Sequence, residues 1–152
     1  MIKLLWKSDY ELNYEKVEWS GTDTQASRQV LFTIPTNHYD KGFQNAKIQL
    51  GDLIHLYDGK TQLFVGIVTS REKSAAIGTT SYTAKDFMHF LLRSNTSRIF
   101  RNKTPEQIVK NVCKEVGVQC GSLVKTKVNI PKLIFDDQSV YDIIIKAYRK
   151  AS

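Results

Sequence analysis

Apolar and polar residues alternate along much of the first half of the chain, which is the period of a β-strand that buries one face. In the run Arg28–Pro35, the side chains of Val30, Phe32 and Ile34 share one face of the expected strand. Pro35 ends this strand because proline has no N–H to donate to a sheet. The same kind of pattern predicts further strands over Ile2–Trp6, Tyr14–Ser20 and Thr80–Ala84.

The strongest strand signal is a hairpin of two β-rich runs, Leu53–Tyr57 and Leu63–Ser70, on either side of Asp58-Gly59. Asp-Gly supplies the backbone conformations that a tight hairpin turn requires. Gly66 interrupts the second run, which predicts either a β-bulge or a close approach of another backbone at that point. With Lys47–Leu50 leading into the hairpin, about six or seven strands are expected before residue 86, as in a small antiparallel barrel or sandwich.

Turn-forming residues separate these runs. Ser20–Asp23 is a turn signal, and Thr36–Asn45 is a polar loop. Glu72–Thr79 contains small and polar residues and is predicted to be a mobile turn between two strands. The predicted fold of residues 1–85 is therefore an antiparallel β-barrel domain.

Helical spacing replaces alternation after residue 85. Asp86–Arg93 is predicted as a short helix. Pro105–Val116 has the clearest helix start, because Thr104 can cap it and Gln107 completes a capping box. Gly117 is a natural helix stop.

The last part of the chain is mixed. Thr126–Ile130 and Lys132–Phe135 are predicted as short strands on either side of Pro131, and Ser139 is predicted to cap a helix that begins at Val140. This amphipathic helix reaches the end of the chain without a stop signal, so we expect a piece of a longer protein. The predicted class is α+β, mainly β: a barrel in residues 1–85 and an incomplete helical and mixed segment in residues 86–152.

The length of 152 residues suits one domain with a second, incomplete one. No apolar run approaches the roughly 18 residues that span a bilayer, and the charged start does not resemble a secretory signal. We therefore expect a soluble protein made in a cytoplasm. Cys113 and Cys120 fit neither a disulfide framework nor a zinc pattern and are expected to be ordinary reduced thiols.

The charge is uneven. Residues 1–76 contain nine basic and nine acidic side chains, whereas residues 77–152 contain thirteen and six, so the net charge of +7 belongs to the second half. Such asymmetry is typical of a surface for nucleic acid or another acidic partner, or of a solvated basic face. Trp6, Trp19, Phe32, Tyr57 and Phe64 are candidate stacking platforms for single strands, but they lie away from the basic half. Nucleic-acid binding is therefore kept only as an alternative.

No catalytic constellation is visible, and no catalytic, cofactor-binding or metal-ligating residues are predicted. Asp136 and Asp137 are adjacent carboxylates, for which a turn or cap role near the last helix is favoured over acid–base catalysis. Asp52 is interpreted as a turn residue before the hairpin. His38, His55 and His89 lie in three different kinds of element and do not predict a metal site.

Several motifs in order resemble the XkdQ/YqbQ-like proteins, which belong with the late control gene D-like hub proteins of contractile phage tails. The resemblance begins with Val17-x-Trp19-Ser20-Gly21 and Gln25-Ala26-Ser27-Arg28. It continues through Gly51-Asp52-x-Ile54, Asp58-Gly59, Leu63-Phe64-x-Gly66-x-Val68-Thr69, Tyr82-x-Ala84-x-Asp86 and Leu91-Leu92-x-Ser94. It ends with Thr104-x-x-x-Ile108-x-x-x-Val112, Glu115-x-Gly117-Val118, Asp137-x-Ser139-x-Tyr141-Asp142-Ile143-Ile144 and Ala147-Tyr148.

The resemblance implies a structural, non-enzymatic role in the baseplate hub that joins the tail tube to the central spike of a phage, prophage or phage-like particle. It implies tail tube, spike and other baseplate proteins as partners, no cofactor, no membrane, and a homotrimer for the full-length protein. It also implies a location in the virion tail after synthesis in the bacterial host cytoplasm. Family members continue beyond this chain. A tail-associated cell-wall hydrolase is the least favoured alternative.

Overall fold

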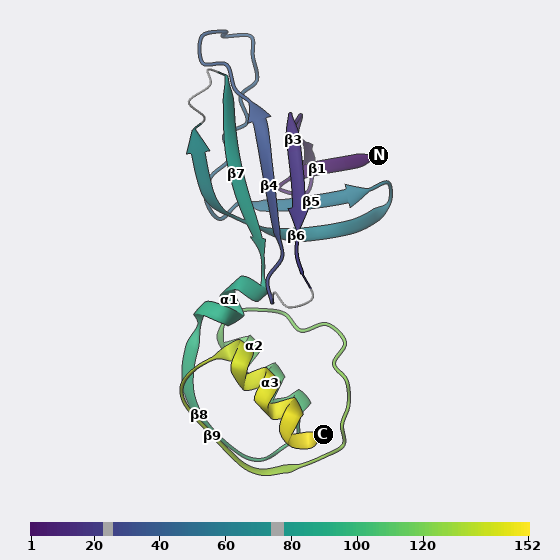
Figure 1. The fold of residues 1–152 in the computed structure, drawn as a ribbon, viewed down its shortest axis with the longest axis vertical. Coiled ribbons are helices and arrows are strands. Elements are labelled where there is room, and N and C mark those ends of the chain that lie inside the picture. Colours follow the sequence, from purple (N-terminus) through teal and green to yellow (C-terminus); the bar gives the residue numbers. More distant parts are fainter. Residues whose placement is uncertain (23–25, 74–77) are drawn as a thin grey trace. The chain divides into compact units, whose positions relative to one another are not determined.

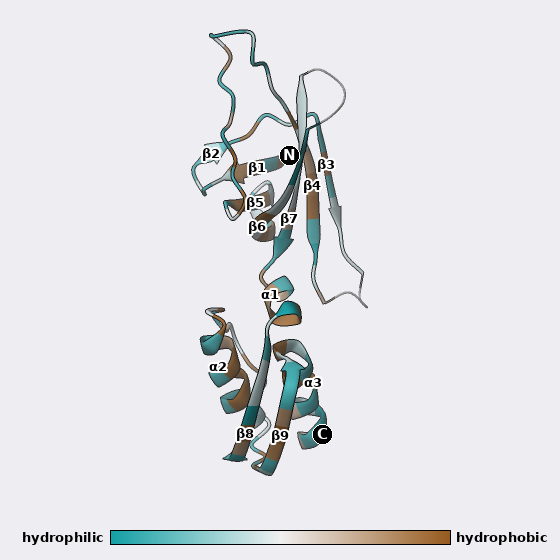
Figure 2. Cartoon of the chain, turned by 90° about the vertical axis from the view of Figure 1, so that its left-hand side faces the viewer, coloured by the Kyte–Doolittle hydropathy of each residue, from teal (hydrophilic) through white to brown (hydrophobic). Residues whose placement is uncertain are grey.

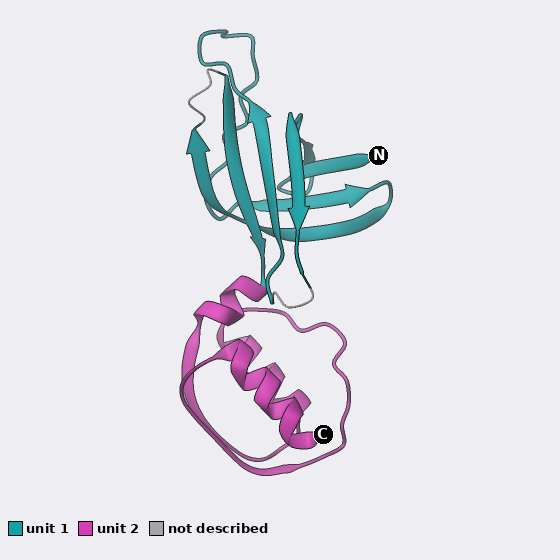
Figure 3. Ribbon diagram, viewed as in Figure 1, with its two compact units in different colours: residues 1–87 teal, residues 88–152 magenta. Residues whose placement is uncertain are grey.

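The computed structural model describes residues 1–22, 26–73 and 78–152, and divides the chain into two compact units, Met1–Phe87 and Met88–Ser152 (Figure 3). Each unit buries its own cluster of apolar side chains. The predicted division into a barrel domain, residues 1–85, and an incomplete helical and mixed segment, residues 86–152, stays a prediction.

Unit 1 is a curled antiparallel sheet of seven strands (Figure 1). The strands are β1 (Ile2–Trp6), β2 (Tyr10–Glu11), β3 (Lys16–Ser20), β4 (Gln29–Pro35), β5 (Leu53–Asp58), β6 (Thr61–Lys73) and β7 (Thr79–Asp86). Their order in the sheet is β2-β1-β5-β6-β7-β4-β3, so β2 and β3 form its edges. The mainly β prediction is confirmed, as an open half-barrel.

The core of unit 1 follows the predicted alternation. Val30, Phe32 and Ile34 of β4 are all buried, whereas their neighbours along the strand are exposed or half-buried. Across the ladder, the rings of Phe32 and Tyr82 stack with centroids 5.4 Å apart. Figure 2 shows β4 as one of the hydrophobic stretches of the chain.

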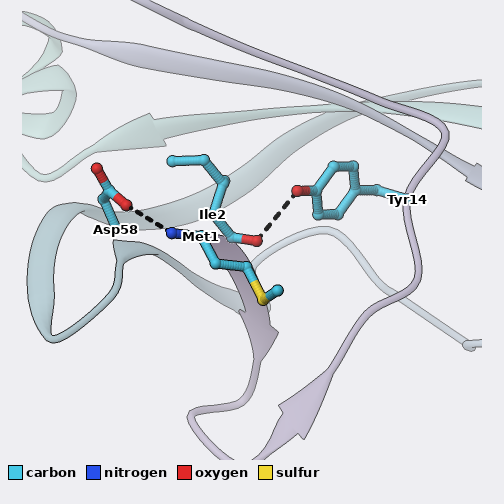
Figure 4. A network of polar contacts seen from close by, with 4 residues as sticks. All are labelled: Met1, Ile2, Tyr14 and Asp58. Carbon is cyan, nitrogen blue, oxygen red and sulfur yellow. Dashed lines mark hydrogen bonds and ion pairs between the residues drawn. The ribbon is translucent and has the colours of Figure 1, made fainter.

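Several strand boundaries differ from prediction, and one strand was not predicted. β6 runs on to Lys73, so the predicted turn over Glu72–Thr79 begins inside a strand, and residues 74–77 of that turn lie outside the described residues. β3 begins at Lys16 instead of Tyr14, whose hydroxyl donates to the carbonyl oxygen of Ile2 at 3.1 Å (Figure 4). The sequence did not predict β2, because two residues are too short to show alternation.

The segments between the strands also depart from the sequence pattern. Lys47–Leu50 is not a strand, although Ile48 is buried in the core of unit 1. Asp23, at the end of the predicted Ser20–Asp23 turn, lies outside the described residues.

Unit 2 packs helices against a two-stranded antiparallel ribbon. Its elements are α1 (Met88–Arg93), β8 (Asn95–Lys103), α2 (Pro105–Glu115), β9 (Ile130–Ser139) and α3 (Val140–Ala151). The core is made by apolar side chains from all of these elements, among them Leu91, Phe100, Ile108, Ile130 and Ile143. Figure 2 shows hydrophobic stretches on α2 and β9.

The capped helices form as predicted. Thr104 accepts a hydrogen bond from the backbone N–H of Gln107, and the Gln107 side chain accepts one from the backbone of Thr104, which completes the capping box. Ser139 likewise accepts from the backbone N–H of Asp142 at the start of α3. α1 begins at Met88, two residues later than predicted.

The ribbon was not predicted in this form. Asn95–Lys103 is polar apart from Ile99 and Phe100, so it gives no clear strand signal, yet it pairs along β9. In place of two short strands around Pro131, the structure has one strand, Ile130–Ser139, with Pro131 at its second residue, and residues 126–129 are not in a strand. Proline is tolerated near a strand start because few ladder bonds are lost there.

Candidate assembly surfaces

The β5–β6 hairpin forms one wall of the unit 1 core. Ile54, Leu56, Phe64 and Val68 point inwards and are buried. Gly59 occupies the turn with a φ of +58°, as the Asp-Gly signal predicted. On the outward side, the rings of His55 and Tyr57 stack with centroids 6.3 Å apart. The hairpin thus covers one side of the core, and its outer face carries aromatic and polar groups.

Gly66 is a point of close backbone approach. A Cβ atom built on Gly66 would lie 2.3 Å from the carbonyl oxygen of Lys85 on β7. The register shifts, which mark bulges, lie nearby between Val68 and Ser70 and between Leu56 and Tyr57. Of the two predicted explanations for this glycine, the close approach is therefore confirmed.

Asp52 ties β1 to the segment that enters the hairpin. Its Oδ2 accepts hydrogen bonds from Trp6 Nε1 at 2.8 Å and from the Gln49 backbone N–H at 2.9 Å, and Lys7 Nζ lies 3.5 Å from Oδ1. Partial burial alone would raise the pKa of Asp52, but these hydrogen bonds and the Lys7 charge together lower it. The carboxylate therefore stabilises the turn before the hairpin, as predicted.

The two sheet edges differ in what they present to solvent. β2 has two residues and is a short edge. β3 is longer and carries Trp19, which is 44% exposed and has the Arg28 guanidinium 5.9 Å from its ring centroid. A sheet edge offers unpaired backbone groups to another chain. The β3 edge is the longer of the two.

The loop between β4 and β5 is ordered by side-chain hydrogen bonds. The Asn45 side chain accepts from the backbone N–H of Asn37 and donates to its carbonyl oxygen. Asn37 Oδ1 in turn accepts from the backbone of Tyr39 and Asp40. Tyr39 is nevertheless almost fully exposed. The loop therefore displays an aromatic side chain on a hydrogen-bonded frame.

Unit 2 carries the excess positive charge of the chain. Residues 88–152 contain twelve basic and five acidic side chains. Arg98 is paired with Glu115, with 3.2 Å between Nη2 and Oε1. A hydrogen bond with the Thr104 side chain is the largest of the effects that lower the pKa of Glu106 to about 2, and the hydrogen bond from the Thr126 backbone N–H is the next. The segment after α2 is thereby tied to the start of that helix.

Asp136 and Asp137 lie inside β9 at an irregularity of the ribbon, which corrects their predicted turn or cap role near α3. Asp136 Oδ1 accepts from Ser97 Oγ at 2.9 Å, and Asp137 Oδ1 accepts from Asn95 Nδ2 at 3.2 Å. The backbone N–H of Asp137 donates to Ser97 Oγ, and its φ is +44°. Both carboxylates therefore stabilise the pairing of β9 with β8.

The His, Cys, Asp and Glu side chains of the described residues do not form a metal-binding cluster. Among residues 1–22, 26–73 and 78–152, no group of three or more His, Cys, Asp and Glu side chains is placed to hold a metal ion. His55 Nε2 lies 3.1 Å from Ser8 Oγ. Cys113 is buried in the unit 2 core, where burial and the neighbouring Cys120 thiol raise its pKa to about 12, so it is a poor nucleophile.

The five aromatic candidates for base stacking are dispersed. Phe32 and Phe64 are buried in the unit 1 core and cannot receive a base. Tyr57 is engaged with His55 and with Gln62, and Trp6 with Asp52. Trp19 is the exposed one of the five.

Among the residues that the structure describes, none of the helices has the length and hydropathy of a membrane span.

A family model described as YQBQ-like matches residues 17–152. The chain is also 30% identical over 142 residues to the uncharacterized protein YqbQ of Bacillus subtilis (strain 168). The matched region covers 92% of this chain and 42% of YqbQ. The chain therefore spans less than half the length of this relative.

Solved structures share the fold. The 43 kDa tail protein of prophage MuSo2 from Shewanella oneidensis superposes with a TM-score of 0.77 at 16% identity, over 99% of this chain and 47% of that one. A tail protein from Neisseria meningitidis gives 0.71 at 15% identity, over 94% and 43%. A component of the type VI secretion system of E. coli gives 0.54 at 16% identity, over 86% and 42%.

Proposed function

This chain belongs to the YQBQ-like family, and we propose that it is a structural, non-enzymatic component of the tail of a phage, prophage or phage-like particle. Its place there is the baseplate hub, which joins the tail tube to the central spike. The observation that carries the proposal is that almost the whole chain shares its fold with part of each of two tail proteins.

The use of the carboxylates in the structure supports a non-enzymatic role. Asp52, Glu106, Asp136 and Asp137 each hold two segments of the chain together through hydrogen bonds. A catalytic carboxylate would instead face a cleft where substrate could reach it. A cell-wall hydrolase has no such observation in its favour.

The open sheet of unit 1 supports assembly into a ring. Ring closure uses heterologous contacts, in which one surface of a subunit meets a different surface of the next. Unit 1 offers three different surfaces of this kind: the β2 edge, the β3 edge and the outer face of the β5–β6 hairpin. The full-length protein is proposed to be a homotrimer with the tail tube, the spike and other baseplate proteins as partners. The basic surface of unit 2 after Ile99 is the other candidate contact.

The test is co-expression of the full-length protein with the tube and spike proteins of the same particle, followed by mass measurement in solution. We expect a trimer and a complex with at least one partner. Trp19→Ser should weaken assembly if β3 is a contact, whereas Val124→Ser, which changes an exposed apolar residue of unit 2, should not. A monomeric full-length protein that binds neither partner would contradict the proposal.

A further inference from the structure

The outer face of the β8–β9 ribbon combines exposed aliphatic side chains with exposed cations. We propose that this face binds an acidic protein segment that carries apolar side chains. The proposal depends on the geometry of unit 2 and goes beyond the hub function, because it names the chemistry of one partner.

The centre of the face is a pair of isoleucines. Ile99 on β8 and Ile134 on β9 are direct partners in the ladder, and each is 58% exposed. The next pair along, Phe100 and Leu133, points to the opposite face and packs into the unit 2 core. Two large aliphatic side chains that meet at the surface form a patch, which is more informative than a single exposed apolar residue.

Two cations lie on the same face, one step along the ribbon. Arg101 pairs with Lys132, and each is two residues from an isoleucine, so their side chains project to the same side. Both are exposed, and neither forms a hydrogen bond or ion pair within the described part of the chain. A partner would therefore not need to break an existing contact to reach them.

Basic grooves flank the ribbon on both sides. The groove between β8 and α2 is lined by Arg98, Lys103 and Lys114, with Ile99 at its margin. The groove between β9 and α3 is lined by Ile134 and by the basic side chains of Lys146, Arg149 and Lys150. Positive charge thus surrounds the aliphatic pair, and complementary charge is what a partner would supply.

The nearby carboxylates do not cancel this charge. Glu115 lies in the first groove but is paired with Arg98. Asp136 and Asp137 are tied to Ser97 and Asn95, beyond the isoleucine pair on the side away from Arg101. The half of the ribbon that holds the isoleucines, Arg101 and Lys132 is therefore apolar and basic.

The chemistry of the face favours an acidic protein segment over other occupants. A second copy that docked through this same face would bring like charges together, and unit 1, with ten basic and ten acidic side chains in residues 1–87, offers no acidic excess to match it. Single-stranded nucleic acid binds by stacking on aromatic rings, and the centre here is aliphatic. Membrane binding by a surface segment needs a broad apolar face, and two isoleucines do not provide one. An extended peptide would place an apolar and an acidic side chain two residues apart, about 6.6 Å, to match Ile99 and Arg101.

The experiment is a selection of random short peptides displayed against the full chain, followed by anisotropy measurements with the selected peptides as probes. One test variant is Ile99→Thr with Ile134→Thr, which keeps β-branched side chains in the ribbon. Another is Arg101→Glu with Lys132→Glu. The matched controls are Val124→Thr with Val128→Thr and Lys125→Glu with Lys127→Glu, which change exposed residues in the segment between α2 and β9.

We expect the selected peptides to combine Asp or Glu with aliphatic residues. Each ribbon variant should weaken their binding about tenfold or more, because it removes apolar area or reverses charge at the contact, whereas the controls should leave it unchanged. Binding should also weaken as the salt concentration rises from about 0.1 M to about 1 M, where the Debye length falls from about 10 Å to about 3 Å. Circular dichroism of every variant shows whether the fold is retained.

Three results would overturn the proposal. The first is a selection without enrichment of acidic peptides, and the second is equal binding to the wild type and to folded ribbon variants. The third is binding of a single-stranded oligonucleotide or of vesicles of phosphatidylglycerol through the same residues in place of the peptides. None of these results bears on assembly with tube or spike, which is measured separately.

Discussion

Gly66 on β6 faces the main chain of Lys85 on β7 so closely that a Cβ atom on Gly66 would lie 2.3 Å from the Lys85 carbonyl oxygen. The same Cβ atom would lie 2.6 Å from the end of the buried Phe64 ring. Since the Lys85 contact is with backbone, neither strand can relieve it without moving the sheet.

Gly66→Ala is therefore expected to destabilise unit 1 by at least about 1–3 kcal/mol, the usual cost of overpacking. Urea unfolding followed by tryptophan fluorescence measures this. The control is Gly42→Ala, which also lies in unit 1, because a Cβ atom there would meet only a side-chain oxygen of Asp40, at 3.3 Å, and the glycine does not have positive φ. Equal unfolding midpoints for the two variants would show that the close approach at Gly66 does not restrict the size of the side chain there.

The two units are expected to unfold separately. Both tryptophans of the chain, Trp6 and Trp19, lie in unit 1, so their fluorescence reports on that unit. Ile108→Ala removes a fully buried side chain of unit 2 and should destabilise it by about 2–5 kcal/mol. The helical circular dichroism signal should then be lost at lower denaturant, whereas the tryptophan transition stays in place. A shift of both transitions together would contradict two independent domains.

Acid should weaken the link between β1 and the hairpin entry. The pKa of Asp52 is lowered in the folded protein from its ordinary value of 3.8, so its contribution to stability is present above that pH and is lost as the pH falls below it. Asp52→Asn should therefore destabilise unit 1 at pH 7 more than at about pH 3. Tryptophan-detected unfolding at both pH values measures the difference. A pH-independent difference would show that the charge of Asp52 contributes nothing.

Glu106 is expected to hold the segment that follows α2. Its pKa is lowered from 4.5 to about 2, so the charged tether to Thr126 is intact above pH 4.5 and is lost between these values as the pH falls. Glu106→Gln should speed hydrogen exchange at the Thr126 amide. Glu115→Gln is the matched control, because Glu115 contacts Arg98 and Thr96 on β8 instead. Unchanged exchange at Thr126 in Glu106→Gln would remove this role.

Much of the local structure could be predicted from the sequence. The alternation in Arg28–Pro35, the Asp58-Gly59 turn and the caps at Thr104 and Ser139 all appear where expected. Each depends on residues within one strand, one turn or one helical turn. Asn95–Lys103 was missed because its strand character comes from pairing with β9, a partner about forty residues away whose register its own residues do not show.

The candidate surfaces were harder to predict than the elements. The β5–β6 hairpin and the basic surface of unit 2 after Ile99 are proposed contacts, but which of their side chains face outward could not be predicted from the sequence. Exposure of Ile99 beside Ile134 follows from the strand register, since a shift by one residue would turn these side chains inward. The sequence shows Ile99 only as one of two adjacent apolar residues, Ile99 and Phe100, in a polar segment and does not indicate which of them faces solvent.

The sequence by itself determined the strand and helix periods, the turns and caps, the family and the location of the positive charge in the second half of the chain. Only the tertiary structure decided that the sheet stays open, that Gly66 meets Lys85, and that Ile99 and Ile134 form one patch with Arg101 and Lys132. The physical reason is the range of the interactions. Periods and caps arise between neighbours in the chain, whereas surfaces arise where distant segments pair and leave one side of each uncovered.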